Sequence, residues 1–290
     1  MFAITGITGK VGGQTANALL TQNKSVRAIM RDVSKGQIWL EQSCEVAEAD
    51  LNNEAALTKA FMGAEGVFVL FPPFYDPADG FGEYMATVDT VYNALLAAKP
   101  GKVVVLSTIG SKAPHSTLLS ALGAMEDRLS QLPMSVAFLR AAWFMENASW
   151  DVASVRDEGV LRSFLQPLDK PFPMVATADI GQLAAKLLQE DWIGVRTVEL
   201  EAAERITPRE VAATFARLLG REVRIEAVPR HTWEPLFRSQ GMKNPMPRIR
   251  MIDGFNEGWI EFDGGNAGSR KGITPLETVL RSLLEEASAR

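Results

Sequence analysis

A glycine loop at the start of the chain constrains the fold more than any other feature. Residues 2–5 form a short apolar run that leads into Gly6, Gly9 and Gly12, and a helical pattern follows over residues 12–22. This spacing between a strand and a helix is typical of the first turn of a βαβ unit that binds a dinucleotide. The glycines allow a tight turn, approach of the pyrophosphate, and close helix packing. The sequence therefore predicts a dinucleotide site here.

Two other interpretations of the loop can be compared with this one. A Walker A loop needs Ser or Thr directly after its lysine, whereas Val11 follows Lys10. A structural strand-to-helix turn without a ligand remains an alternative.

Apolar runs alternate with helical patterns through the first 200 residues. Further strands are expected at 25–30, 45–49, 66–71, 102–107, 135–140 and 197–202. The runs 67–71 and 103–106 are continuously apolar, as in parallel strands that are buried on both faces. The predicted fold class is α/β, with a Rossmann-type doubly wound parallel sheet of six or seven strands. We expect the order 3-2-1-4-5-6, with 2–5 in the interior and 197–202 closing one edge.

The last third of the chain follows a different pattern. Thr207-Pro208 begins a helix that runs to Gly220, followed by a strand at 222–228 and helices at 233–239, 248–262 and 275–287. A glycine-rich loop is expected at 263–271. These elements predict a smaller, discontinuous α+β lobe. The expected division is a dinucleotide-binding domain of 1–146 plus 176–202, and a substrate or partner lobe of 147–175 plus 203–290.

Composition excludes several classes of protein. No run reaches 18 apolar residues, so no membrane span is expected, and the absence of a basic leader favours a cytoplasmic location. The single Cys44 and the two histidines, His115 and His231, exclude a Cys/His zinc site, and no metal is expected. The net charge of −5 argues against nucleic-acid binding. Residues 205–250 nevertheless hold ten Lys or Arg against four Glu, either as a solvated surface or as a face for an acidic ligand or partner.

The end of the second expected strand indicates which dinucleotide binds. A carboxylate at this position usually holds a ribose 2′-hydroxyl, whereas an arginine accommodates a 2′-phosphate. Arg31 comes first after the strand and Asp32 second, and Lys35 and Lys10 could add positive charge. The sequence therefore favours NADP(H) as the cofactor, with Asp32 as the feature that argues for NAD(H).

Several segments together resemble one family. They are T-G-I-T-G-K-V-G at 5–12, V-R-A-I-M-R-D at 26–32, A-D-L at 49–51, L-R-A-A-W-F-M-E-N at 139–147 and A-D-I-G at 178–181. These motifs span roughly residues 1–190 and resemble the NmrA-like family of atypical short-chain dehydrogenases/reductases. Within that family, they look most like the bacterial NADPH:quinone oxidoreductases.

The resemblance implies a set of cofactor contacts at the matching positions. These would be Thr8, Gly9, Lys10 and Val11 at the pyrophosphate, Arg31 at the 2′-phosphate, Asp50 and Leu51 at the adenine, Phe71 and Pro72 along the ribose, and Ser107 and Thr108 near the nicotinamide. All of them lie at the carboxyl ends of expected strands, where open α/β sheets bind ligands.

The chain also departs from the wider superfamily. Many members transfer a proton with a Tyr-x-x-x-Lys pair, which none of Tyr75, Tyr84 and Tyr92 can form here. Glu126 and Glu146 are candidate proton carriers, with a structural role as the alternative. No catalytic residue is therefore predicted.

Aromatic residues follow two of the expected strands. Phe74 and Tyr75 follow the fourth strand, and Trp143, Phe144 and Asn147 follow the sixth. Such residues suit a flat apolar acceptor, although the alternative is that Trp143 and Phe144 only pack between the lobes. The predicted function is NADPH-dependent hydride transfer to a quinone-like or other small conjugated acceptor. The alternative is a non-catalytic NADP(H) sensor that acts through a protein partner, and a homodimer also stays open.

Overall fold

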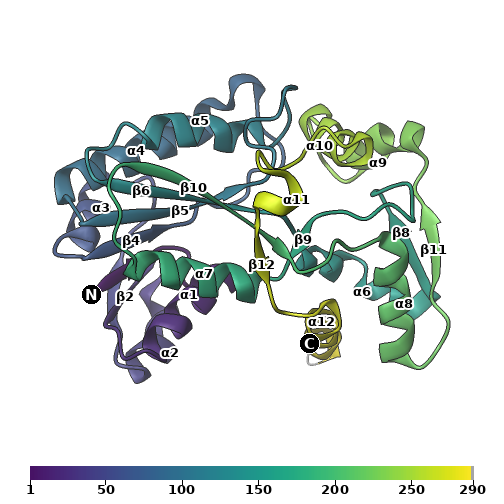
Figure 1. The fold of residues 1–290 in the computed structure, drawn as a ribbon, viewed down its shortest axis with the longest axis horizontal. Helices are drawn as coiled ribbons and strands as arrows, with labels where there is room; N and C mark the ends of the chain where they lie inside the picture. The colour runs from purple at the N-terminus through teal and green to yellow at the C-terminus, as the bar shows by residue number, and fades with distance from the viewer. Residues whose placement is uncertain (289–290) are drawn as a thin grey trace.

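A parallel sheet of eight strands forms the centre of the computed structural model, which describes residues 1–288 apart from the side chain of Asp79 (Figure 1). Every pairing in this sheet is parallel. The strands, from one edge to the other, are β3 (Glu45–Glu48), β2 (Val26–Met30), β1 (Phe2–Ile4), β4 (Gly66–Val69), β5 (Lys102–Thr108), β6 (Ser135–Ala141), β10 (Val195–Ala202) and β12 (Arg270–Gly272).

Helices cover both faces of this sheet. One face carries α1 (Lys10–Leu20), α2 (Gln37–Glu41) and α7 (Thr177–Gln189), and the other carries α3 (Glu54–Phe61), α4 (Gly82–Ala98) and α5 (Ser120–Leu129) (Figure 1). Alternate residues of one strand enter different cores: Phe2 and Ile4 pack with the first set of helices, and Ala3 packs with the second. Burial on both faces explains why the central strands β4 and β5 contain continuously apolar runs.

A smaller lobe lies beside the carboxyl ends of β6 and β10 (Figure 1). It has two short parallel sheets and its own aromatic cluster, which includes Trp233 and Phe237. Its elements are β7 (Trp143–Phe144), η3 (Met145–Trp150), α6 (Val152–Glu158), β8 (Val160–Ser163), β9 (Met174–Val175), α8 (Pro208–Leu219), β11 (Arg224–Ala227), η4 (Arg230–Thr232), α9 (Trp233–Ser239) and α10 (Met246–Glu257). The shorter elements α11 (Gly265–Gly268), η1 (Val33–Gly36) and η2 (Asp79–Phe81) and the last helix, α12 (Leu276–Ser288), complete the chain.

The predicted fold class and the order 3-2-1-4-5-6 are confirmed, with β1 in the interior of the sheet. Two expectations at the edge were wrong, because the sheet has eight strands and β10 does not close it. The edge strand is β12, which pairs with β10 through Arg270–Gly272. This segment has no apolar alternation: Lys271 within it and Ser269 just before it bind the buried Glu201 instead of entering a core. In Figure 1, α12 follows β12 and lies between α7 and the smaller lobe.

Other differences concern the smaller lobe. The helix expected at 248–262 begins earlier and ends at Glu257, because Gly258 adopts φ +91°. The segment 263–271 contains α11 and part of β12 in place of a simple loop. The short strand β8 was not predicted from the sequence and pairs with β11.

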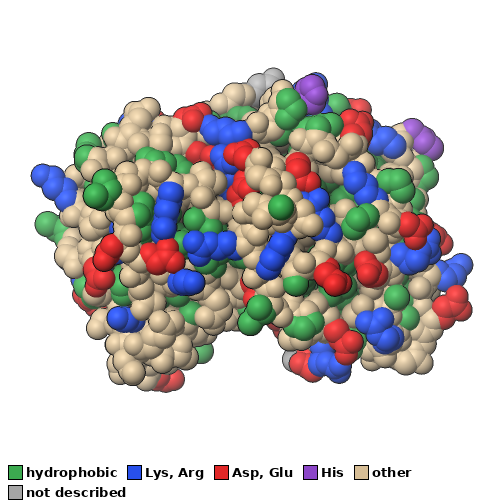
Figure 2. All heavy atoms as spheres, viewed as in Figure 1, with side chains coloured by type: hydrophobic (Ala, Val, Ile, Leu, Met, Phe, Trp, Pro, Cys, Tyr) green, Lys and Arg blue, Asp and Glu red, His purple; other side chains and the backbone are tan. Residues whose placement is uncertain are grey.

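Charge on the face shown in Figure 2 is mixed. Lys and Arg side chains are interspersed with Asp and Glu, so this face presents no large region of one sign. Among the described residues, no helix is both long and apolar enough to cross a membrane. Within the same part of the chain, no cluster of three or more His, Cys, Asp and Glu could hold a metal ion.

Candidate functional site

The glycine loop joins β1 to α1 in a conformation that only glycine suits. Gly6 has φ +63°, and a Cβ on Gly12 would overlap the carbonyl oxygen of Gly6. Gly9 is the N-cap of α1 and provides no side-chain cap, and the first turn holds no acidic residue. The N–H groups of this turn therefore remain available to an anion, as at other helix N-termini that bind phosphate.

The other predicted pyrophosphate contacts differ in exposure. Thr8 and Lys10 are exposed, whereas the side chain of Val11 is buried, so Val11 could meet a phosphate only through its backbone. The ammonium of Lys10 pairs with Glu286 of α12 at 3.1 Å, and both side chains are about half exposed. This exposed pair can exchange for a phosphate at little cost.

Arg31 is the first residue after β2. It is exposed, and among the described residues the structure records no ion pair or side-chain hydrogen bond for it. Asp32, by contrast, caps η1 by accepting hydrogen bonds from the backbone N–H (3.0 Å) and the hydroxyl (2.6 Å) of Ser34. These hydrogen bonds lower the pKa of Asp32, with a smaller contribution from Lys35, 4.0 Å away. Asp32, the residue that argued for NAD(H), thus has one of its two carboxylate oxygens, Oδ1, engaged by Ser34.

The residues expected to contact the adenine and the ribose follow β3 and β4, at the same edge of the sheet. Asp50 follows β3 and accepts a hydrogen bond from Asn52 N–H at 2.8 Å, and Leu51 beside it is half-buried. Phe71 follows β4 and packs on Tyr84, with 5.6 Å between ring centroids, and Pro72 is exposed. Leu51, Phe71 and Pro72 offer an apolar surface, and Asp50 adds one carboxylate beside it.

Ser107, at the end of β5, is part of a buried ion-pair cluster. Its hydroxyl donates to Glu126 at 2.5 Å, and Arg140 donates to both oxygens of the same carboxylate at 3.0 and 2.7 Å. Glu126 is 4% exposed, which fits the structural role named as its alternative. Thr108 is half-buried and donates only to the adjacent carbonyl of Ile109, so it is the more accessible of the two predicted hydroxyls.

Glu146 also has a structural contact. Its carboxylate accepts hydrogen bonds from the backbone N–H (2.9 Å) and the hydroxyl (2.5 Å) of Thr177 at the start of α7. The other oxygen of Glu146 is buried and has no partner among the described residues. Asn147 next to it is half-buried, and no side-chain hydrogen bond is recorded for it in residues 1–288.

The aromatic candidates form two pairs beside this edge of the sheet. Trp143 lies edge-on to Phe255 of α10, with 5.4 Å between centroids, as its packing interpretation predicts. Tyr75 lies edge-on to Trp150 at 6.3 Å, and these two rings are 46% and 58% exposed. Phe74 and Phe144 are half-buried nearby in sequence. Sequence analysis missed Trp150 and Phe255, since each lies outside the segments that directly follow a strand of the sheet.

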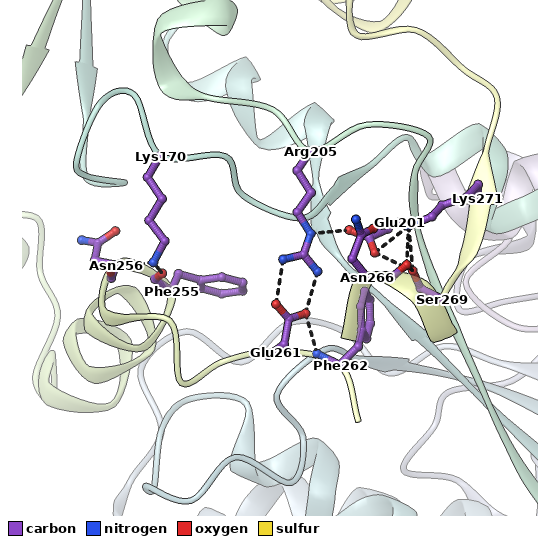
Figure 3. Close-up of polar contacts among 10 residues, drawn as sticks. All are labelled: Lys170, Glu201, Arg205, Phe255, Asn256, Glu261, Phe262, Asn266, Ser269 and Lys271. Atoms are coloured by element: carbon purple, nitrogen blue, oxygen red, sulfur yellow. Dashed lines mark hydrogen bonds and ion pairs between the residues drawn. The ribbon is translucent and has the colours of Figure 1, made fainter. Parts of the chain in front are cut away.

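A polar network fixes the segment after α10 to the end of β10. Figure 3 shows Arg205 between Glu261, which it contacts twice at 2.7 Å, and Glu201, which it contacts at 2.9 Å. Lys170 donates to the carbonyls of Phe255 and Asn256 at 2.9 and 2.7 Å, at the C-terminal end of α10. Positive charge stabilises this end of a helix. Both contacts restrain the position of α10 over the candidate site.

Replacing Arg205 with Met is expected to lower the free energy of unfolding by about 2–4 kcal/mol, because the buried Glu201 loses an ionic partner. Ser269 and Lys271 still bind Glu201. The loss of stability should therefore be smaller than for a buried carboxylate left without any partner. Urea denaturation measures the change. Arg209→Met removes an exposed pair with Asp169 and should have little effect, and equal losses in the two variants would contradict the role of burial.

Asp151, between η3 and α6, gives the chain a pH-dependent stability. Burial raises the pKa of Asp151 to about 7. Between about pH 4 and pH 7 the unfolded chain loses this proton while the folded chain retains it, so stability falls as the pH rises. Asp151→Asn should therefore be more stable than the parent by about 2–4 kcal/mol at pH 8, and nearly equal to it at pH 4.

Urea denaturation across this pH range measures the effect of Asp151. Asp157→Asn, an exposed change in α6, the helix that follows Asp151, serves as the control. A stability difference for Asp151→Asn that does not grow between pH 4 and pH 8 would show that the residue is ionised in the folded protein.

Comparisons with known proteins agree with this architecture. The model of the NmrA-like family matches residues 1–257. Quinone oxidoreductase 2 of Escherichia coli (strain K12) is 24% identical over 244 residues, which cover 83% of this chain and 82% of that protein. A (4-alkanoyl-5-oxo-2,5-dihydrofuran-3-yl)methyl phosphate reductase of Streptomyces griseus is 28% identical over 229 residues, covering 78% and 76%.

A solved structure extends the likeness to the whole fold. Triphenylmethane reductase of Citrobacter sp., complexed with NADP(H), superposes with a TM-score of 0.80 at 19% identity, covering 98% of this chain and 99% of that one. The family match covers most of the chain and includes every motif on which the resemblance was based. The protein therefore belongs to the NmrA-like family.

Proposed function

We propose that this protein is an NADPH-dependent oxidoreductase that transfers a hydride to a quinone-like or other small conjugated acceptor. The observation that supports it most is the position of the exposed aromatic pair, Tyr75 and Trp150. These rings follow β4 and β6, at the same edge of the sheet as the glycine loop. The relatives named as a quinone oxidoreductase and as a reductase of a phosphate-bearing substrate also support reductase chemistry.

The residues at this edge fit NADP(H). The absence of a Cβ at Gly12 keeps the turn tight, and the uncapped first turn of α1 suits the pyrophosphate. The guanidinium of Arg31, which has no ion pair within residues 1–288, suits a 2′-phosphate, because arginine binds phosphate through two parallel hydrogen bonds. The reductase of Citrobacter sp. is itself known in complex with NADP(H). When bound, NADPH supplies the hydride.

The side chains near the end of β5 and β6 favour an acceptor that needs no strong acid. Reduction of a ketone requires a proton at the developing alkoxide, and general acid catalysis typically contributes about 10²–10⁴-fold. The hydroxyl of Ser107 is committed to Glu126, which leaves Thr108 and Asn147 to donate hydrogen bonds. A reduced quinone is a delocalised phenolate, for which such a hydrogen bond or water suffices. The main task of the protein is then to hold the acceptor in position.

Turnover with a panel of acceptors tests this proposal. NADPH oxidation should be fastest with quinones, and simple aliphatic ketones should be inert. Efficient reduction of aliphatic ketones with inert quinones would overturn the mechanism and require an acid that has not been identified.

The packing of Trp143 leads to a further prediction. Trp143→Ala should raise the acceptor KM roughly 2- to 10-fold, because an aromatic contact of this kind contributes about 0.5–1.5 kcal/mol. The Kd for NADPH should be nearly unchanged. Trp192→Ala, in the loop before β10, is the matched control and should alter neither constant. Parallel losses of NADPH and acceptor binding at Trp143 would indicate a purely structural role.

The second candidate function is a sensor that binds NADP(H) without turnover and acts through a protein partner. The missing Tyr-x-x-x-Lys pair favours it. Tight NADPH binding together with no oxidation by any quinone, aldehyde or imine would support the sensor over the enzyme.

A further inference from the structure

Helix α10 presents two large side chains to the candidate site. Arg248 and Phe255 are seven residues apart, which places them on nearly the same face of the helix. Phe255 contacts Trp143, which directly follows β6. This contact and the anchoring of the helix end by Lys170 turn the same face toward the carboxyl edge of the sheet. Arg248 is therefore held by a rigid element rather than by a loop.

Aromatic rings surround the guanidinium of Arg248. Its central carbon lies 4.4 Å from the ring centroid of Phe237 and 5.7 Å from that of Trp150. Trp150 in turn contacts Tyr75. Since Tyr75 follows β4 and Trp150 follows β6, the guanidinium lies beside the pair of rings that the proposed function assigns to the acceptor.

Arg248 has no anionic partner among the described residues. Its one recorded hydrogen bond is a weak contact of 3.8 Å from Nη1 to the sulfur of Met242, and among the described residues no carboxylate forms an ion pair with it. Several other arginines of this lobe do have an acidic partner; Arg230, for example, binds Asp253 at 2.6 and 2.7 Å. Burial lowers the pKa of Arg248, although the group stays charged at neutral pH. A partly buried cation without an acidic partner is costly and so points to a ligand.

We propose that Arg248 binds an anionic oxygen group on the acceptor, a carboxylate, a sulfonate or a phosphate monoester, while Trp150 and Tyr75 contact its conjugated ring. This inference rests on the proposed function and specifies the substrate class of the same site. Arg248 is a positioning residue, because it holds a group that takes no part in hydride transfer. The planar guanidinium can donate two parallel hydrogen bonds to any of these anions, and its aromatic surroundings strengthen the attraction by excluding water.

Binding of redox-inert aromatic compounds tests the inference without turnover. The probes are 2-naphthalenesulfonate, 2-naphthoate, 2-naphthyl phosphate and the neutral 2-naphthol, titrated by calorimetry into the protein saturated with NADPH. At least one anion should bind about 10-fold or more tightly than 2-naphthol, as expected for a charge-assisted hydrogen bond. The ranking of the three anions identifies which group the site prefers.

Three variants separate direct contact from other effects. Arg248→Met should remove the preference for the anion and leave the affinity for 2-naphthol nearly unchanged, and Arg248→Lys should retain part of the preference. Arg250→Met is the matched control, since it removes the same charge from the same helix at a position rotated by about 200°. Arg250 is exposed and lines a separate hollow with Phe81 and Ser116, and its loss should have little effect.

Four results would overturn the inference. They are equal affinity for anions and 2-naphthol in the parent, an equal loss in Arg250→Met, a lower NADPH affinity in Arg248→Met, and unchanged anion binding in both Arg248 variants. The third result would assign Arg248 to the cofactor instead. Because the probes accept no hydride, anion binding by a protein that reduces no acceptor would refute only the proposed function. Quinone reduction without any anion preference would refute only the role of Arg248.

Discussion

Replacing Gly12 with Ala is expected to destabilise the protein by about 1–3 kcal/mol and to weaken NADPH binding roughly 10- to 100-fold. The added Cβ would overlap the carbonyl oxygen of Gly6. Because this oxygen belongs to the backbone, no change of side-chain rotamer can relieve the overlap. Helix α1 must then move away from the turn, and the N–H groups of its first turn move with it. Urea denaturation and a fluorescence titration with NADPH measure the two effects.

Gly82→Ala is the control for this substitution. Gly82 begins α4, its added Cβ would meet nothing within 4 Å, and its backbone is not left-handed. Alanine there should leave NADPH binding unchanged and add about 0.4–1 kcal/mol of stability. If Gly12→Ala bound NADPH as tightly as the parent, the turn could not be the pyrophosphate site.

The centre of the fold could be predicted because its signals are local and repeated. Most of the first six strands are apolar runs next to a helical pattern, and burial of the central ones on both sheet faces leaves little ambiguity about which strands lie beside them. The edge could not be predicted in this way. β12 and β8 are strands only because a partner strand lies beside them, and residues 270–272 carry two positive charges in three positions.

In the candidate site, too, the local features could be predicted from the sequence and the long-range contacts could not. The glycine loop was predicted because its spacing has a steric cause, and Gly12 does lie against Gly6. The contacts of Ser107 with Glu126 join residues 19 positions apart, and nothing in their spacing indicates which hydroxyl remains free. Arg248 was one of ten positive residues in a basic stretch. Only the tertiary structure distinguishes it from paired arginines such as Arg230.

The preference for NADPH over NADH should depend on Arg31. Arg31→Ala is expected to reduce this preference about 10- to 150-fold, because a charge-assisted hydrogen bond contributes about 1.5–3 kcal/mol. The structure is consistent with this, since one carboxylate oxygen of Asp32 is engaged by Ser34. In parallel titrations of both dinucleotides, the affinity for NADPH should fall, whereas the affinity for NADH should stay nearly unchanged.

Lys24→Ala provides the matched control for Arg31. Lys24 is an exposed cation just before β2, at the opposite end of the strand from Arg31, and should not affect the preference. Arg31→Lys keeps the charge but loses the planar guanidinium, so its preference for NADPH should lie between those of the parent and Arg31→Ala. We expect Lys35 and Lys10, two further exposed cations, to supply any preference for NADPH that remains in Arg31→Ala. Equal affinities of the unmodified protein for NADPH and NADH would contradict this assignment, because Arg31 would then contribute nothing that distinguishes a 2′-phosphate from a hydroxyl.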